Sequence, residues 1–240
     1  ADSLSNSIWL DKWLNELGVD YPANSINTSS LKSSIFSKPS KDLNSIKIPE
    51  LKKEISPIVF GCDNQINEVH AFAMFDYYYS KGGKVFDTAY IYNHGLSDKY
   101  LGDWINSRNL TDVVVLGKGA HTPDCFPDKI RPQIEESLSR GNIDKLDIYC
   151  LHRDNLDVPV TEFIDALNDC KKDGLIDVLG ASNWSLERFK SANDYAHEQQ
   201  KAGFKVLSNN FSLARMIEPV WPGCFSCDET YLKYLKDNNI

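Results

Sequence analysis

The sequence predicts an α/β fold in which parallel strands alternate with helices and curl into a barrel of the (β/α)8 type. Short apolar runs recur from residue 56 onward, and a segment with helical spacing follows each of them. Each strand and helix together take about 31 residues, the usual length of a βαβ repeat. No Gly-x-Gly-x-x-Gly loop follows the first run, which favours a barrel over an open dinucleotide-binding sheet.

Six such units can be recognised in residues 56–240, which form the predicted barrel domain. The predicted strands are 56–62, 84–89, 112–118, 146–152, 176–183 and 204–211, each rich in Val, Ile, Leu, Phe or Cys. The predicted helices are 67–80, 97–107, 127–139, 160–172, 185–200 and 228–240. A complete barrel has eight strands, so we expect strands seven and eight to be missing from this chain. An isolated six-strand piece would then expose the edges of its first and last strands.

Residues 1–55 differ in composition and are predicted to be an N-terminal extension or linker. Residues 8–17 have helical spacing, with an apolar stripe that consists of Leu10, Trp13, Leu14 and Leu17. The segment 24–47 is rich in Ser, Asn, Lys and Pro and contains little that could be buried. The helix could be the tail of an upstream domain, or it could pack on the barrel.

Composition excludes several classes of protein. A hydrophobic fraction of 42% and a charged fraction of 25% are typical of a soluble globular protein. The 26 basic and 34 acidic residues give a net charge of −8, which argues against nucleic-acid or anionic-membrane partners. No apolar run approaches the ~20 residues of a membrane span. The chain opens without a signal-peptide pattern, so we expect a cytoplasmic location.

The six cysteines do not suggest a disulfide framework or a metal site. Cys62, Cys150 and Cys170 fall in predicted strands or a helix, where free thiols pack as small apolar groups. Cys224 and Cys227 have C-x-x-C spacing, but no second pair and no nearby His accompany them. We therefore expect no bound metal.

Polar residues stand at the carboxyl ends of several predicted strands. They are Asp87, Lys118, His152 and the pair Ser182 and Asn183. Parallel strands of a barrel place these ends on one face, where active sites of such folds are built. Tyr92 lies in the loop that follows the second strand. We expect all of these side chains to converge, with the loop residues His94 and His121 nearby.

These residue types suit the reduction of a carbonyl group. A tyrosine with a pKa near 10 is a poor acid at neutral pH and needs a neighbouring cation that favours its ionised form. Lys118 can be that cation, and Asp87 can hold it charged and aimed. Neutral His152 can donate a hydrogen bond to the substrate oxygen. Ser182 and Asn183 offer donors and acceptors for a carboxamide such as that of nicotinamide.

Four segments resemble the motifs of the aldo-keto reductase family. Residues 86–98 are similar to its motif in which Asp and Tyr stand five apart, followed by Gly-x-Ser-Glu, with Asp98 in place of Glu. Residues 117–118 resemble its strand-three Thr-Lys, and residues 151–154 resemble the segment around its strand-four His. Residues 174–185 resemble its Gly-Lys-Ile-Arg-x-x-Gly-Val-Ser-Asn-Phe. The motifs occur in the family's order over residues 56–240.

The resemblance implies an NAD(P)H-dependent oxidoreductase that acts on a small carbonyl or alcohol substrate. It makes Asp87, Tyr92, Lys118 and His152 the catalytic tetrad and Ser182 and Asn183 ligands of the nicotinamide carboxamide. Ser208 stands where many members carry a carboxamide-binding Gln, and Asn209 or Asn210 could replace it. The resemblance also implies that the cofactor is NADP(H) rather than NAD(H), and it implies no metal.

Two other functions stay open at this point. The same barrel could be a non-catalytic nicotinamide-binding regulatory subunit, or the 240 residues could be an inactive fragment. Retention of all four tetrad residues favours the enzyme, because a pure sensor has no use for Tyr92 beside Lys118.

Overall fold

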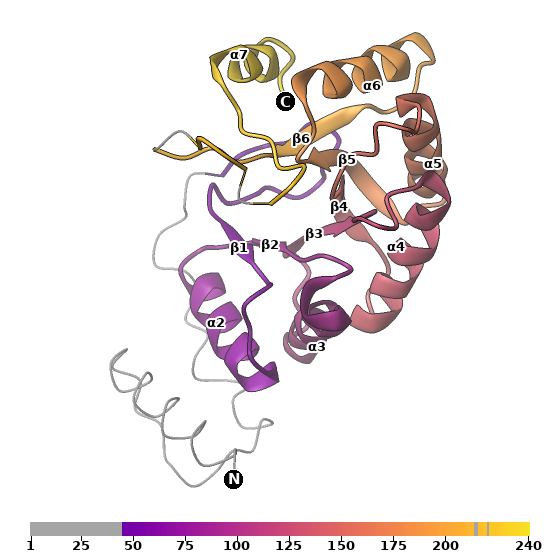
Figure 1. Cartoon of the computed structure of the whole chain (residues 1–240). Helices are drawn as coiled ribbons and strands as arrows, with labels where there is room; N and C mark the ends of the chain where they lie inside the picture. Colours follow the sequence, from indigo (N-terminus) through magenta and orange to yellow (C-terminus); the bar gives the residue numbers. More distant parts are fainter. Residues whose placement is uncertain (1–44, 214–215, 220) are drawn as a thin grey trace, which may run out of the picture.

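The computed structural model describes residues 45–213, 216–219 and 221–240, and in them six parallel strands form one sheet in the order β1-β2-β3-β4-β5-β6. The strands are β1 (Val59–Gly61), β2 (Val85–Asp87), β3 (Val114–Gly119), β4 (Leu146–Leu151), β5 (Ile176–Ser182) and β6 (Phe204–Ser208). Figure 1 shows them curled into a half-barrel with the helices outside. The predicted α/β fold, a part of a (β/α)8 barrel, is confirmed.

Helices follow the strands in regular alternation. They are α2 (Glu68–Ser80), α3 (Leu96–Arg108), α4 (Pro127–Gly141), α5 (Val160–Lys172), α6 (Leu186–Glu198) and α7 (Glu229–Asp237), with a short 3-10 helix η2 (Tyr92–Gly95) before α3. Side chains of Asn67, Ser185 and Asp228 accept hydrogen bonds from backbone N–H groups in the first turns of α2, α6 and α7. These caps start the three helices within a residue of their predicted positions.

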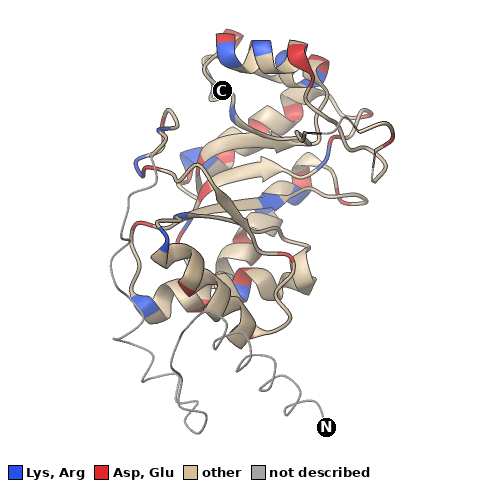
Figure 2. Cartoon of the chain, turned by 90° about the vertical axis from the view of Figure 1, so that its left-hand side faces the viewer, with Lys and Arg blue, Asp and Glu red and all other residues tan. Residues whose placement is uncertain are grey.

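The outer helices carry mixed charge. Figure 2 shows basic and acidic residues side by side on the helices that cover the sheet. Ion pairs one turn apart join Lys99 to Asp103 on α3 and Arg131 to Glu135 on α4. Within the described ranges, no helix is long and apolar enough to cross a membrane.

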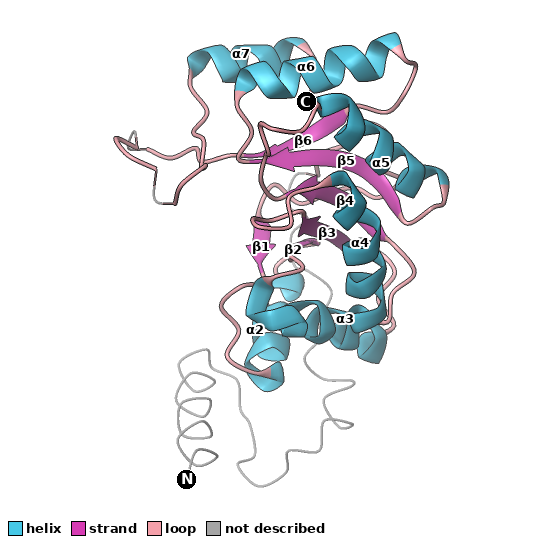
Figure 3. Ribbon diagram, turned by 45° about the vertical axis from the view of Figure 1, so that its right-hand side comes forward, coloured by secondary structure: helices cyan, strands magenta, loops and turns pink. Residues whose placement is uncertain are grey.

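The two faces of the sheet bury different apolar clusters, because successive side chains of a strand point to opposite faces. Figure 3 shows the helices on the outer side of the curled sheet. The outer cluster lies between the strands and these helices and is rich in aromatic rings. In it Phe86 of β2 lies 4.9 Å from Trp104 of α3 and 5.3 Å from Phe75 of α2, centroid to centroid. The inner cluster is smaller and consists of Val85, Val114, Leu116, Ile148, Cys150 and Val178.

A loop at residues 46–55 closes the inner cluster at the amino ends of the strands. Ile46 and Ile55 pair through antiparallel backbone hydrogen bonds of 2.8 and 3.0 Å, and Ile48, Leu51 and Ile55 pack against the inner cluster. The packed structure thus begins before residue 56, where the sequence suggested a domain boundary, and the boundary itself stays a prediction. The predicted helix at residues 8–17 lies outside the described residues.

The first and last strands are shorter than predicted. Predicted strand 56–62 shrinks to β1, and predicted strand 204–211 ends at Ser208. Among the described strands, β1 pairs only with β2 and β6 only with β5, so each has one ladder of hydrogen bonds instead of two. Ile58 and Val59 beside this edge are 59% and 45% exposed.

Candidate active site

The polar strand ends point to the inner face, since each of them follows an inner-face residue by two positions. Val85 precedes Asp87, Leu116 precedes Lys118 and Cys150 precedes His152 in this way. The apolar interior of the sheet therefore changes to polar side chains at its carboxyl end. There the tetrad candidates and the carboxamide-ligand candidates surround one cavity of about 730 Å³. The structure thus brings these residues together at one cavity, as we expected from the sequence.

Lys118 and Asp87 form an ion pair between neighbouring strands β3 and β2. The Lys118 side chain is 3% exposed and the Asp87 side chain 22% exposed, so the pair is largely removed from water. The Lys118 ammonium lies 4.9 Å from the centroid of the Tyr92 ring. A buried cation that is neutralised on one side by Asp87 thus faces the phenol on the other.

The loop that carries Tyr92 is held from several sides. The N–H groups of Thr88 and Tyr90 donate 2.8 Å hydrogen bonds to the carbonyls of Leu116 and Lys118 on β3. The hydroxyl of Thr88 donates to buried Asp98 over 2.7 Å. Arg140 of α4 donates to the carbonyl of Tyr90 over 2.8 Å and stacks on the Tyr90 ring. Tyr92 therefore has a defined position although it belongs to a loop.

A run of left-handed residues turns the chain directly after Tyr92. Asn93, His94 and Gly95 have φ angles of 47°, 54° and 88°. A Cβ atom at Gly95 would meet the guanidinium of Arg140 at 2.5 Å. Glycine is favoured at this position by its positive φ, and any other residue there would also have to displace the Arg140 guanidinium.

For each of these three groups, burial and the charge of its neighbour act on the pKa in opposite directions. Burial raises the pKa of Tyr92 above its usual value near 10, and the charge of Lys118 offsets only part of this rise. Burial also raises the pKa of Asp87, again against the effect of Lys118. For Lys118, burial acts to lower the pKa, but the charges of Asp87 and Tyr92 outweigh it and raise the pKa. Lys118 is therefore a stable cation near neutral pH.

His152 stands opposite this trio and is neutral. Its ring centroid lies 5.9 Å from that of Tyr92 and 4.8 Å from that of His121. Burial lowers the pKa of His152 to about 2, with further contributions from Lys118, His121 and Arg153. Its Nδ1 atom is buried and has no hydrogen-bond partner among the described residues.

Ser182, Asn183 and Ser208 lie together where β5 and β6 end. The Ser182 hydroxyl donates to the carbonyl of Ser208 over 2.9 Å, and the Asn183 amide nitrogen donates to the Ser182 hydroxyl over 3.0 Å. The Asn183 amide oxygen has no partner among the described residues and belongs to the cavity wall. A carboxamide N–H could donate to this oxygen, so the residues present fit a nicotinamide group.

Asn209 and Asn210, the two alternatives to Ser208, have different environments. The amide oxygen of Asn209 accepts from the backbone N–H of Trp184 over 3.2 Å, and its amide nitrogen donates to the carbonyl of Trp184 over 2.8 Å. This side chain joins β5 to β6. The amide nitrogen of Asn210 donates to the Ser226 hydroxyl over 3.0 Å. Of Ser208, Asn209 and Asn210, only Ser208 has a side chain without a hydrogen bond to the described residues.

Sequence reasoning missed some residues of the cavity wall. Arg153, Ile91 and Trp221 line the cavity, as does the suggested His121, whereas the suggested His94 does not. Arg153 could have been found from its position directly after His152 at the end of β4. Trp221 belongs to a connection without regular structure, and no sequence pattern marked it.

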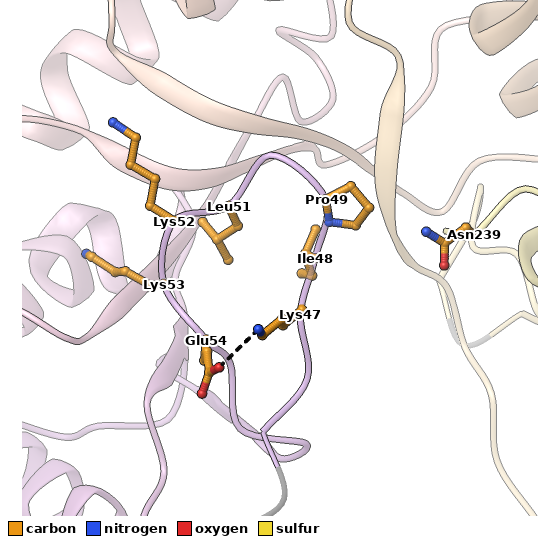
Figure 4. Close-up of a pocket in the computed structure, with 8 residues that line it drawn as sticks. All are labelled: Lys47, Ile48, Pro49, Leu51, Lys52, Lys53, Glu54 and Asn239. Atoms are coloured by element: carbon orange, nitrogen blue, oxygen red, sulfur yellow. Dashed lines mark ion pairs between the residues drawn. The ribbon is translucent and has the colours of Figure 1, made fainter.

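Other candidate features carry no site. A second cavity, of about 490 Å³, lies at the 46–55 loop, where Lys47 and Glu54 approach each other to 3.7 Å (Figure 4). Throughout the described ranges, no three or more His, Cys, Asp or Glu side chains are grouped to hold a metal ion. All six cysteines are free thiols, and Cys62, Cys150 and Cys170 are buried.

Comparison with known proteins agrees with this geometry. A family model described as "Aldo/keto reductase family" matches residues 58–226, which is most of the chain. The chain belongs to the aldo/keto reductase family. Its predicted family resemblance is thereby confirmed.

Curated relatives in the family include oxidoreductases of fungi. The chain is 27% identical over 191 residues to norsolorinic acid reductase B of Dothistroma septosporum, covering 69% of the chain and 48% of the relative. It is 26% identical over 168 residues to a putative aryl-alcohol dehydrogenase of Saccharomyces cerevisiae, covering 64% and 45%. The chain thus spans about half the length of these relatives.

A solved structure of similar fold is the glycerol dehydrogenase from Gluconobacter oxydans. It superposes with a TM-score of 0.57 at 21% identity, over 70% of this chain and 55% of that one. At this identity the likeness concerns the fold, which is that of an aldo/keto reductase barrel.

Proposed function

We propose that the protein reduces an aldehyde or ketone, or oxidises the corresponding alcohol, with NADP(H) in preference to NAD(H). The observation that carries this proposal is the ion pair of Lys118 and Asp87 under the ring of Tyr92, opposite neutral His152 in one cavity. A bound nicotinamide cofactor supplies the hydride in this chemistry. Ser182, Asn183 and Ser208 would hold its carboxamide.

In this proposal Tyr92 is the proton donor to the carbonyl oxygen of the substrate. A buried phenol with a raised pKa holds its proton at neutral pH, and the charge of Lys118 stabilises the phenolate that proton transfer leaves behind. Asp87 is a positioning residue, because it neutralises Lys118 on the side away from Tyr92. The phenolate oxygen of Tyr92 would then take up a proton from solvent, which restores the phenol.

His152 would hold the same carbonyl oxygen by a hydrogen bond. Its low pKa keeps the ring neutral, so one ring nitrogen carries a proton and the other does not. A proton on Nδ1 would be a buried donor without an acceptor, so we place the proton on Nε2. An Nε2–H beside the Tyr92 ring can orient the substrate oxygen without competing for its proton.

The proposed substrate is a small carbonyl compound with an aromatic body. Ile91 and Trp221 give the cavity wall apolar side chains. Among the relatives, the name of the yeast protein specifies an aryl alcohol, which supports an aromatic substrate here. The test is consumption of NADPH or NADH by the full-length protein in the presence of benzaldehyde. Faster turnover with NADPH is the expected result. No turnover with either cofactor, together with tight binding of both, would favour a non-catalytic nicotinamide-binding subunit.

A further inference from the structure

Arg153 is a cation on the cavity wall that has no acidic partner among the described residues. Its Nη1 donates a 3.1 Å hydrogen bond to the carbonyl of His152, and no ion pair among the described residues includes it. The adjacent carboxylate of Asp154 is occupied, because Arg188 donates to it with two nitrogens over 2.8 and 2.9 Å. The Nε and Nη2 donors of Arg153 are thus left without partners in this part of the protein.

The backbone at Arg153 is fixed. Its carbonyl accepts hydrogen bonds from the indole N–H of Trp184 over 3.3 Å and from the thiol of Cys125 over 3.1 Å. Both donors are buried side chains of the outer core. The guanidinium therefore starts from a rigid point beside His152, and its three side-chain nitrogens are a preorganised fork.

The other charges of the cavity leave the His152 side positive. Lys118 and Asp87 neutralise each other. Asp63, on the chain after β1, acts on the Asp87 and Tyr92 side, where it raises both pKa values after the larger effects of burial and Lys118. Arg153, after β4, acts on His152. An anionic group would therefore meet attraction next to His152 and repulsion next to Asp63.

We propose that Arg153 binds a carboxylate of the substrate, so that the protein prefers carbonyl compounds that carry an acid group. This inference rests on the proposed carbonyl reduction at the same site. The carbonyl would lie between Tyr92 and His152, the body of the substrate against Ile91 or Trp221, and the carboxylate on the free donors of Arg153. Guanidinium and carboxylate form paired, charge-assisted hydrogen bonds in this arrangement.

Matched substrates test the preference. The kcat/KM values of the full-length protein are measured for 3- and 4-formylbenzoate and for their methyl esters, which keep the aldehyde and the ring but lose the charge. We expect the wild type to prefer the acid, and Arg153→Gln to lower the acid-to-ester ratio by about 10-fold or more, as for a lost charged hydrogen bond. Arg153→Lys should recover part of the ratio. Arg131→Gln, which removes an arginine from the outer surface of α4, should leave it unchanged.

Binding measurements separate this inference from the proposed function. Calorimetric titration with benzoate and with neutral benzamide should show Arg153-dependent preference for benzoate. If neither aldehyde is reduced but this preference is present, the carbonyl reduction fails and the anion site stands. Equal binding of benzoate and benzamide by the wild type would overturn the inference. A second result would also overturn it: Arg153→Gln weakens NADPH binding about 10-fold but changes neither the acid-to-ester ratio of kcat/KM nor the preference for benzoate over benzamide. Arg153 would then serve the cofactor phosphates.

Discussion

Lys118 of β3 pairs with Asp87 of β2 and holds its ammonium 4.9 Å from the centre of the Tyr92 ring. The two side chains meet because each stands two positions after an apolar residue of the inner cluster, on the same face of neighbouring strands. The cation is thus set in a largely dry environment, where its effect on the phenol is stronger than in water. The predictions below follow from this arrangement and from its neighbours.

Removal of the Lys118 charge should make Tyr92 a weaker acid. In Lys118→Met, burial would raise the pKa of Tyr92 without the opposing cation. We expect kcat/KM to fall about 100-fold or more, and the pH at which the phenol titrates in the residual activity to move upward. Lys145→Met is the control, because Lys145 pairs with Asp177 between neighbouring strands but lies at their opposite end, away from Tyr92. An unchanged pH profile in Lys118→Met would remove Lys118 from the mechanism.

His152 should make the folded state sensitive to acid. Its pKa is about 2 in the folded protein and near 6.5 when unfolded, so below pH 6.5 the unfolded state binds a proton that the folded state does not. Stability contributed by neutral His152 is present above pH 6.5 and is lost as pH falls, by about 2 kcal/mol at pH 5.

Urea unfolding at pH 7 and pH 5 measures this effect. His152→Gln should lose less stability than the wild type between the two pH values, by about that 2 kcal/mol. His197→Gln, which changes an exposed histidine of α6, should lose as much as the wild type. Parallel losses in the wild type and His152→Gln would contradict the buried neutral state of His152.

Asn183 should bind cofactor rather than support the fold. It has a φ of 59°, so Asn183→Gly removes the amide without adding backbone strain. We expect NADPH affinity to fall about 10-fold, the cost of one hydrogen bond, with a melting temperature within a degree or two of wild type. Asn209→Ala is the contrasting variant, because its amide binds both backbone groups of Trp184 and its loss should lower the melting temperature. Equal NADPH affinity in Asn183→Gly and wild type would exclude this role.

The 240-residue chain expressed as it stands should associate and lack reductase activity. Strands β1 and β6 have one neighbour each among the described residues, and the edge residues Ile58 and Val59 are exposed. Light scattering after size exclusion should show oligomers, and the double substitution Ile58→Lys and Val59→Lys should reduce them. A monomer that melts cooperatively and turns over aldehyde would show that the six strands suffice.

Much of the fold could be predicted, because short apolar runs mark the strands and helical spacing of apolar residues marks the helices between them. Lys118 and His152 could be placed close together from the sequence, because each stands at the carboxyl end of a predicted parallel strand and these ends share one face. The ends of the two edge strands were not predicted correctly. Residues 56–58 lie outside β1, and residues 209–211 lie outside β6, where Asn210 instead forms an isolated bridge with Ser226.

The unpredicted parts of the site depend on contacts between distant residues. The turn after Tyr92 needs left-handed Asn93 and His94 and the approach of Arg140 from α4. The 46–55 loop covers the inner cluster with three apolar residues, although the sequence assigned this segment to an N-terminal extension or linker. The resemblance to a family located Tyr92, whereas spacing alone placed it only in a loop.

The most direct test of the proposed chemistry compares two tyrosines of one loop. Tyr92→Phe removes the phenol that lies beside Lys118, and Tyr90→Phe removes one that donates to Glu136 at the surface. Aldehyde-dependent oxidation of NADPH by the full-length protein is measured for both, with NADPH affinity as a check on folding. We predict a loss of about 100-fold or more for Tyr92→Phe and a change of no more than about threefold for Tyr90→Phe. Turnover by Tyr92→Phe within a few-fold of wild type would contradict the assignment of Tyr92 as proton donor.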